Sequence, residues 1–129
     1  MSVKKIISGL TLSLLLSSGA ANADGNKLLA ECQILINALD SGTLSTAQGA
    51  NFAAGNCIGI SNGVRTTLMF LQPDIPQDSA FRACLPEGGI NNGQAVRIIA
   101  SYLKKNPSEL HLHESILAIF AFLDVYPCK

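Results

Sequence analysis

Two histidines are the residues of this chain best suited to chemistry near neutral pH, and both lie in one short segment. His111 and His113 flank Leu112, so an extended backbone would turn both imidazoles to the same side. Glu109 and Glu114 are the only carboxylates close to them in the sequence. A metal site would need further ligands, so we interpret the histidines as solvated or facing a partner.

The four cysteines offer a second kind of chemistry. Their spacing contains no Cys-x-x-Cys pair, which argues against a zinc site or a redox-active disulfide. An even number of cysteines in a small exported chain is typical of a disulfide framework, and a bridged cysteine is no nucleophile. We predict that the bridged residues are Cys32, Cys57, Cys84 and Cys128.

Motifs of familiar enzymes are absent from the sequence. It contains no Gly-x-Ser-x-Gly, no phosphate-binding loop and no His-Glu-x-x-His. Asp74 and Asp78 are four residues apart, but Pro76 between them argues against a shared helical face. We therefore predict that the protein is not an enzyme and holds no cofactor and no metal.

The N-terminal residues 1–23 have the pattern of a secretory signal peptide. Lys4-Lys5 precede an apolar run over residues 6–16, and Ala21-Asn22-Ala23 forms a small-x-small cleavage site. The apolar run is shorter than the about 20 residues that a helix needs to span a bilayer. We predict cleavage after Ala23, which would release the mature chain into the periplasm.

The mature part, residues 24–129, is long enough for one domain with one core. Without Lys4 and Lys5 the chain carries seven basic and nine acidic residues, a net charge of −2. Such a surface has no electrostatic reason to bind nucleic acid or anionic lipid. We predict a single helical domain whose partners include neither nucleic acid nor, after signal cleavage, a membrane.

Helical periodicity runs through the mature chain, and no segment alternates cleanly as a strand would. We predict a helix that ends near Asp40-Ser41-Gly42 and a longer one over residues 48–71. Two more follow, one with an N-cap at Asn92 and one over Ser115–Val125. The expected fold class is all-α, a small bundle of four to five helices stapled by two disulfides.

Two local bridges suit this arrangement. If the first two helices form an antiparallel hairpin, Cys32 and Cys57 lie at similar heights, and a hairpin of the last two brings Cys84 near Cys128. The nested alternative, Cys57–Cys84 within Cys32–Cys128, stays open because sequence alone does not determine connectivity. We favour the local pairing.

Three glycines recur every four residues in the long predicted helix: Gly55, Gly59 and Gly63. Together they lower its helix propensity by about 3 kcal/mol relative to alanine. Close approach of a neighbouring helix would offset that loss, and we expect such packing here. The alternative is a backbone surface reserved for a ligand.

Several short elements occur in one order between Leu29 and Cys128. They are Cys57-Ile58-Gly59-Ile60-Ser61-Asn62-Gly63, Cys84-Leu85-Pro86-Glu87-Gly88, Gln94, Tyr102-Leu103, Pro107 and Pro127-Cys128. This ordered set resembles the Rap/Tai family of immunity proteins, which protect bacteria from peptidoglycan-cleaving amidase effectors of type VI secretion. Ile60 stands where that family usually has an aromatic residue.

The resemblance implies a periplasmic, all-helical inhibitor without catalysis of its own. Similar proteins form homodimers and cover the substrate groove of a cysteine amidase, with a loop in its active-site cleft. We expect this chain to contact its cognate effector through two polar connections between helices. The candidate residues are Lys105, Asn106, Ser108, Glu109, His111, His113 and Glu114 in the later connection, and Asp74, Asp78 and Arg82 in the earlier one.

Two other functions are alternatives. A periplasmic chaperone or stress-binding module would bind many unfolded clients and have no dedicated toxin. A periplasmic hydrolase would lose its activity on substitution of His111 or His113, whereas a binding protein would change its affinity instead.

Overall fold

The computed structural model describes residues 24–129, and the predicted signal peptide lies outside these residues. The helices are α1 (Gly25–Ser41), α2 (Ala50–Leu71), α3 (Asn92–Lys105) and α4 (Glu114–Val125), with short 3-10 turns η1 (Gln72–Asp74) and η2 (Pro107–Glu109). The prediction of an all-α fold is confirmed, since no strand forms between residues 24 and 129. Among these residues, no helix is both long and apolar enough to cross a membrane.

Short-range capping sets the helix ends. Asp24 caps α1 by accepting a hydrogen bond from a backbone N–H of the first turn, and Gly42 ends the helix at a φ of 74°. At α3 the cap is Asn91, one residue before the predicted Asn92. Asn91 and Gln94 each accept a hydrogen bond from the backbone N–H of the other, which is a capping box.

The core is built around α3, which packs on each of the other three helices. Its Val96, Ile99 and Leu103 recur at helical spacing and are fully buried. From α4, Leu117 and Phe122 reach the same core and are also fully buried. The apolar stripe of α3 therefore organises the packing, and the other helices surround it.

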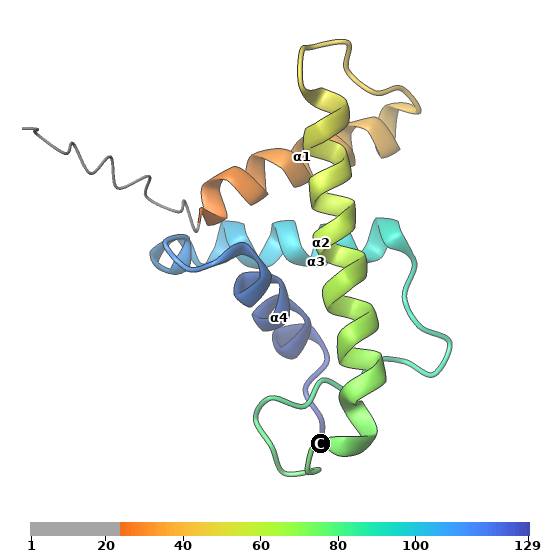
Figure 1. Cartoon of the computed structure of the whole chain (residues 1–129), viewed down its shortest axis with the longest axis vertical. Coiled ribbons are helices and arrows are strands. Elements are labelled where there is room, and N and C mark those ends of the chain that lie inside the picture. The colour runs from red at the N-terminus through yellow and green to blue at the C-terminus, as the bar shows by residue number, and fades with distance from the viewer. Residues whose placement is uncertain (1–23) are drawn as a thin grey trace, which may run out of the picture.

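The first two helices cross, and the antiparallel hairpin expected from the sequence is wrong. Figure 1 shows α2 along the length of the molecule, with α1 and α3 running across it. The Cys32–Cys57 disulfide joins α1 to α2 where they meet. The linking segment, residues 42–49, has a glycine with positive φ at each end, Gly42 and Gly49, so the chain can change direction there.

The second disulfide, Cys84–Cys128, ties the segment before α3 to the segment after α4. Beside it the Cys84 backbone N–H donates to the carbonyl oxygen of Tyr126 at 2.8 Å, and Ala83 and Pro127 form an isolated antiparallel bridge. The structure thus has the local pairing that the sequence favoured, and the nested alternative is wrong.

Removing either disulfide should lower stability, and the buried one should matter more. Loop-closure entropy of the unfolded chain predicts a loss of stability of about 3.5 kcal/mol without Cys32–Cys57, whose cysteines are 25 residues apart. For Cys84–Cys128, with a separation of 44 residues, the predicted loss is about 4 kcal/mol. Cys32 and Cys57 are fully buried, so Cys32→Ser/Cys57→Ser also leaves two unpaired hydroxyls at about 1–3 kcal/mol each. Thermal unfolding should therefore rank this variant below Cys84→Ser/Cys128→Ser. A melting temperature that reductant does not change would contradict the expectation.

Candidate functional site

The connection between α3 and α4 is held to the body of the protein at several points. Asn106 Nδ2 donates to the carbonyl oxygen of Tyr102 at 2.9 Å and so satisfies the last turn of α3. Leu110 accepts a hydrogen bond at 2.8 Å from the backbone N–H of Gly25. A Cβ on Gly25 would lie 2.9 Å from the Leu110 backbone, so only glycine permits this contact. The connection is thus positioned by the start of α1.

A part-buried hydrogen bond stiffens the middle of the connection. The Tyr102 hydroxyl, on α3, donates to a carboxylate oxygen of Glu109. Burial, and then this hydrogen bond, raise the pKa of Tyr102 to about 12. The hydroxyl therefore keeps its proton at physiological pH and acts as a permanent donor to the turn η2.

The two histidines stabilise the connection and are not gathered into a metal or catalytic site. His113 Nδ1 accepts a hydrogen bond from the backbone N–H of Ser115 at 3.2 Å, which caps the start of α4. His111 Nδ1 lies 2.9 Å from the carbonyl oxygen of Ser108. Among residues 24–129, no cluster of three or more metal-ligating side chains is present.

The candidate residues of this connection separate into two groups. Asn106, Glu109 and His113 make the structural hydrogen bonds described above. Lys105, Ser108 and His111 lie exposed on its surface, and Glu114 is half-buried at the first position of α4. The connection therefore presents a small set of polar side chains on a firmly held backbone.

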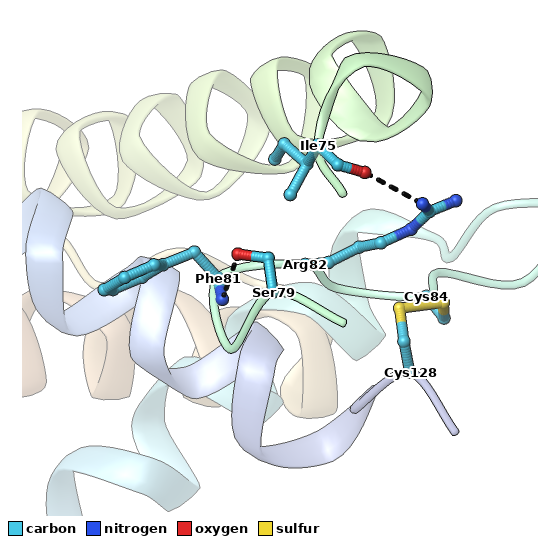
Figure 2. Close-up of a disulfide and its surroundings, with 6 residues drawn as sticks. All are labelled: Ile75, Ser79, Phe81, Arg82, Cys84 and Cys128. Carbon is cyan, nitrogen blue, oxygen red and sulfur yellow. Dashed lines mark hydrogen bonds between the residues drawn. A yellow bond between two sulfur atoms is a disulfide. The ribbon is translucent and has the colours of Figure 1, made fainter. Parts of the chain in front are cut away.

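The segment after α2, residues 72–82, is held by Arg82. Figure 2 shows its guanidinium donating to the carbonyl oxygen of Ile75, at 2.9 Å, close to the Cys84–Cys128 disulfide. This contact folds the segment back on itself, so Arg82 has a structural role. Asp74 and Asp78 are exposed and belong to no ion pair that the structure contains.

Sequence reasoning missed the aromatic residue of this segment. Phe81 is 67% exposed, and Figure 2 shows its ring on the opposite side of the segment from the disulfide. Phe52 and Phe70 on α2 are exposed to 73% and 78%. The only signal of this exposure in the sequence was that these phenylalanines lie outside a clear apolar stripe. Exposed aromatic side chains of this size are typical of binding surfaces.

The glycines of α2 do not pack against a neighbouring helix, and that prediction was wrong. A Cβ added to Gly55, Gly59 or Gly63 would meet nothing within 4 Å. The three glycines instead line a groove of about 520 Å³ between α2 and α4. The alternative considered for the sequence, a backbone surface reserved for a ligand, stays a prediction, and the structure shows that the glycine surface is open.

The groove is mainly apolar, and its polar lining side chains are those of Asn56, Thr67 and Ser115. Its walls include Val64, Leu68 and Leu71 from α2 and Ile119 from α4. No charged side chain lines it. An uncharged, elongated groove of this kind fits an apolar partner surface better than an anion, a metal or a nucleic acid.

Next to Asn56, which lines the groove, lies a buried carboxylate, Glu31 of α1. It accepts a hydrogen bond from Asn56 Nδ2 of α2 at 2.5 Å and pairs with Lys27 at 2.9 Å. The hydrogen bond to Glu31 raises the pKa of Lys27 above its ordinary value. The hydrogen bond to Asn56 thus joins α1 to α2, and the ion pair with Lys27 lies within α1, so both carboxylate oxygens of Glu31 are engaged.

Comparison with known proteins identifies one family. A sequence model of the Rap1a immunity proteins matches residues 24–128, which is nearly the whole described chain. Neither the curated proteins nor the solved structures contain a match.

Spectrophotometric titration should find Tyr102 ionising near pH 12. In Tyr126→Phe, Tyr102 is the only tyrosine left, so the tyrosinate absorbance reports it alone. The pKa of Tyr102 rises from 10.0 to about 12 on folding. The contribution of this shift to the free energy of unfolding is therefore complete below about pH 10 and is lost as the pH rises towards 12.

Glu109→Gln provides the control for this titration. It should lower the midpoint while leaving it above 10.0, because burial is the larger cause of the shift. A midpoint near 10 in the folded Tyr126→Phe protein, with the helices verified by circular dichroism, would contradict both the burial of Tyr102 and its hydrogen bond to Glu109.

Proposed function

The chain belongs to the family of Rap1a immunity proteins, and from this we propose that it binds and inhibits a peptidoglycan amidase effector of type VI secretion. The proposal places the complex in the periplasm, where the amidase would reach its substrate and where the predicted signal peptide would deliver the inhibitor. The family match over residues 24–128 is the observation that carries it. Residues 24–129 would act as one domain and, as similar proteins do, as a homodimer.

Inhibition in this proposal is steric. The α3–α4 connection would enter the active-site cleft of the amidase and exclude its substrate. Its backbone is already ordered by the Tyr102–Glu109 and Gly25–Leu110 hydrogen bonds. Little conformational entropy would therefore be lost on binding, which favours high affinity for an interface of given area.

Exposed polar side chains supply the specificity of the proposed contact. Lys105, Ser108 and His111 are available at the surface of the connection. The segment of residues 72–82 would provide a second, acidic contact through Asp74 and Asp78, with Arg82 holding the backbone in place. No group of the inhibitor needs to react, which agrees with the structural use of His113 and Glu31.

The proposal predicts a stable complex with an amidase encoded beside this gene. Lys105→Glu and Ser108→Arg should each weaken that complex by about 10- to 100-fold, since they change exposed side chains at the proposed contact centre. Both should leave the melting temperature unchanged. Calorimetric titration of the purified amidase measures the affinity, and survival of cells with periplasmic amidase measures protection.

Thr46→Arg is the control for Ser108→Arg, because it adds the same charge at an exposed position of the link between α1 and α2, away from both proposed contact segments (Figure 1). It should retain affinity and protection. Neighbouring amidases that stay fully active and unbound in the presence of the wild-type protein would refute the proposal. Binding to many unfolded proteins instead would favour the chaperone alternative.

A further inference from the structure

The two disulfides differ in how far solvent reaches them. Cys32 and Cys57 are fully buried where α1 crosses α2. Cys84 is exposed and Cys128 is half-buried, beside the segment of residues 72–82. Thiol–disulfide exchange requires a thiolate to reach a sulfur atom, so exposed disulfides are the labile ones. A thiol in solution therefore has direct access to the Cys84–Cys128 bridge and not to the buried one.

A small basic pocket adjoins the exposed bridge. It has a volume of about 190 Å³ and is lined by Gln77, Arg82, Cys84, Cys128 and Lys129. Neither Arg82 nor Lys129 pairs with a carboxylate of the described chain, and no acidic side chain lines the pocket. Figure 2 shows the Arg82 side chain and the disulfide on the same side of the segment. Unpaired cations beside a disulfide attract anions and stabilise a thiolate.

The size of the pocket limits what can enter it. Its volume equals that of about six water molecules, which suits the sulfur end of a small molecule. The sequence also lacks the Cys-x-x-Cys pair of a redox catalyst, so the bridge is suited to accept a thiol. We propose that Cys84–Cys128 is a thiol-exchange site, which takes a small acidic thiol onto Cys84 and so releases residues 72–83 from the end of α4.

The proposed exchange is a nucleophilic substitution at sulfur. The incoming thiolate attacks Sγ of Cys84, the more exposed residue of the bridge, and forms a new S–S bond. The Cys84–Cys128 bond breaks, and its electron pair stays on Sγ of Cys128, which then takes up a proton from water. A second molecule of the thiol can attack the sulfur of the first. This step leaves two protein thiols and one disulfide of the small thiol.

Only short backbone contacts accompany the disulfide between this segment and the end of α4. The Cys84 backbone N–H donates to the carbonyl oxygen of Tyr126, and Ala83 pairs with Pro127 in an isolated bridge. The hydrogen bond of the Arg82 guanidinium lies within the segment itself. Opening the exposed bridge therefore loosens this segment and leaves the helical core, with its buried disulfide, in place.

This inference rests on the proposed function only for its consequence. Asp74 and Asp78, the acidic contact proposed for the effector, lie in the segment that would be released. Opening the bridge should then weaken the complex, while the α3–α4 connection keeps its hydrogen bonds. The exchange itself is measured without any effector, so failure of one proposal leaves the other standing.

Peptide mapping by mass spectrometry tests the site. The folded mature chain, residues 24–129, is treated with mercaptoacetate, and free thiols are then alkylated. We expect the adduct on Cys84 and the alkyl group on Cys128, at a rate at least about 10-fold above that at Cys32–Cys57. An adduct on Cys128, the absence of any adduct, or equal rates at both bridges would overturn the proposal. Equal rates would mean that exchange requires unfolding of the whole domain.

Two thiols of similar size test the preference for an acidic ligand. Mercaptoacetate is anionic and cysteamine is cationic. The ratio of their rates is compared between proteins, so that their intrinsic reactivities cancel. Lys129→Gln should lower the ratio of anionic to cationic rate by about 2- to 5-fold, the effect of one exposed charge. Lys105→Gln removes the same charge outside the pocket and should leave the ratio unchanged. An unchanged ratio in Lys129→Gln would refute the acidic ligand.

Limited proteolysis tests the release of the segment. Trypsin cleaves after Arg82, and the next residue, Ala83, is fully buried in the bridged protein. Cleavage there should be at least about 10-fold faster once Cys84–Cys128 is open, whereas Arg97 and Lys104 within α3 should stay intact. Cys84→Ser/Cys128→Ser should show the same cut without any thiol. Unchanged resistance at Arg82 would contradict the release. Cleavage within α3 as well would equally overturn the proposal, because the bridge would then support the whole fold.

Discussion

The buried Cys32–Cys57 disulfide, where α1 crosses α2, is the constraint on which the rest of the structure depends. A covalent bond at a crossing fixes one point of each helix, and the Glu31–Asn56 hydrogen bond holds a second point close by. α3 then fills the space beneath the crossing with its apolar stripe. Because α2 is held near one end, most of its length runs beyond α1 (Figure 1), and one side of it is exposed.

That arrangement explains why a helix with few charges has so much exposed apolar surface. α4 covers α2 incompletely and leaves the groove at Ile119. In a monomer, exposed phenylalanines and interior glycines both lower the stability that the helix could have. The residues that weaken α2 in isolation form an exposed apolar face, which is typical of an interaction surface.

The α3–α4 connection shows the opposite strategy. Several of its polar side chains hydrogen-bond within the protein, as in the histidine cap of α4 and the tyrosine–glutamate hydrogen bond. A connection built in this way keeps its shape without a partner, and a protein that must inhibit a toxin on arrival benefits from such preorganisation. The protein thus combines a rigid polar connection and an apolar helix face on one cross-linked core.

Local information determined much of this protein. The periodicity of α3, the ends near Gly42 and Pro107, and the full use of four cysteines are short-range or compositional features, and the sequence predicted them. The family was also evident from the order of its short motifs. Only the tertiary structure decided that α1 and α2 cross, that Gly59 faces solvent, and that His113 caps a helix. Each of these depends on the direction in which a helix face or side chain points, which is set by packing between segments far apart in the chain, and periodicity alone carries no such direction.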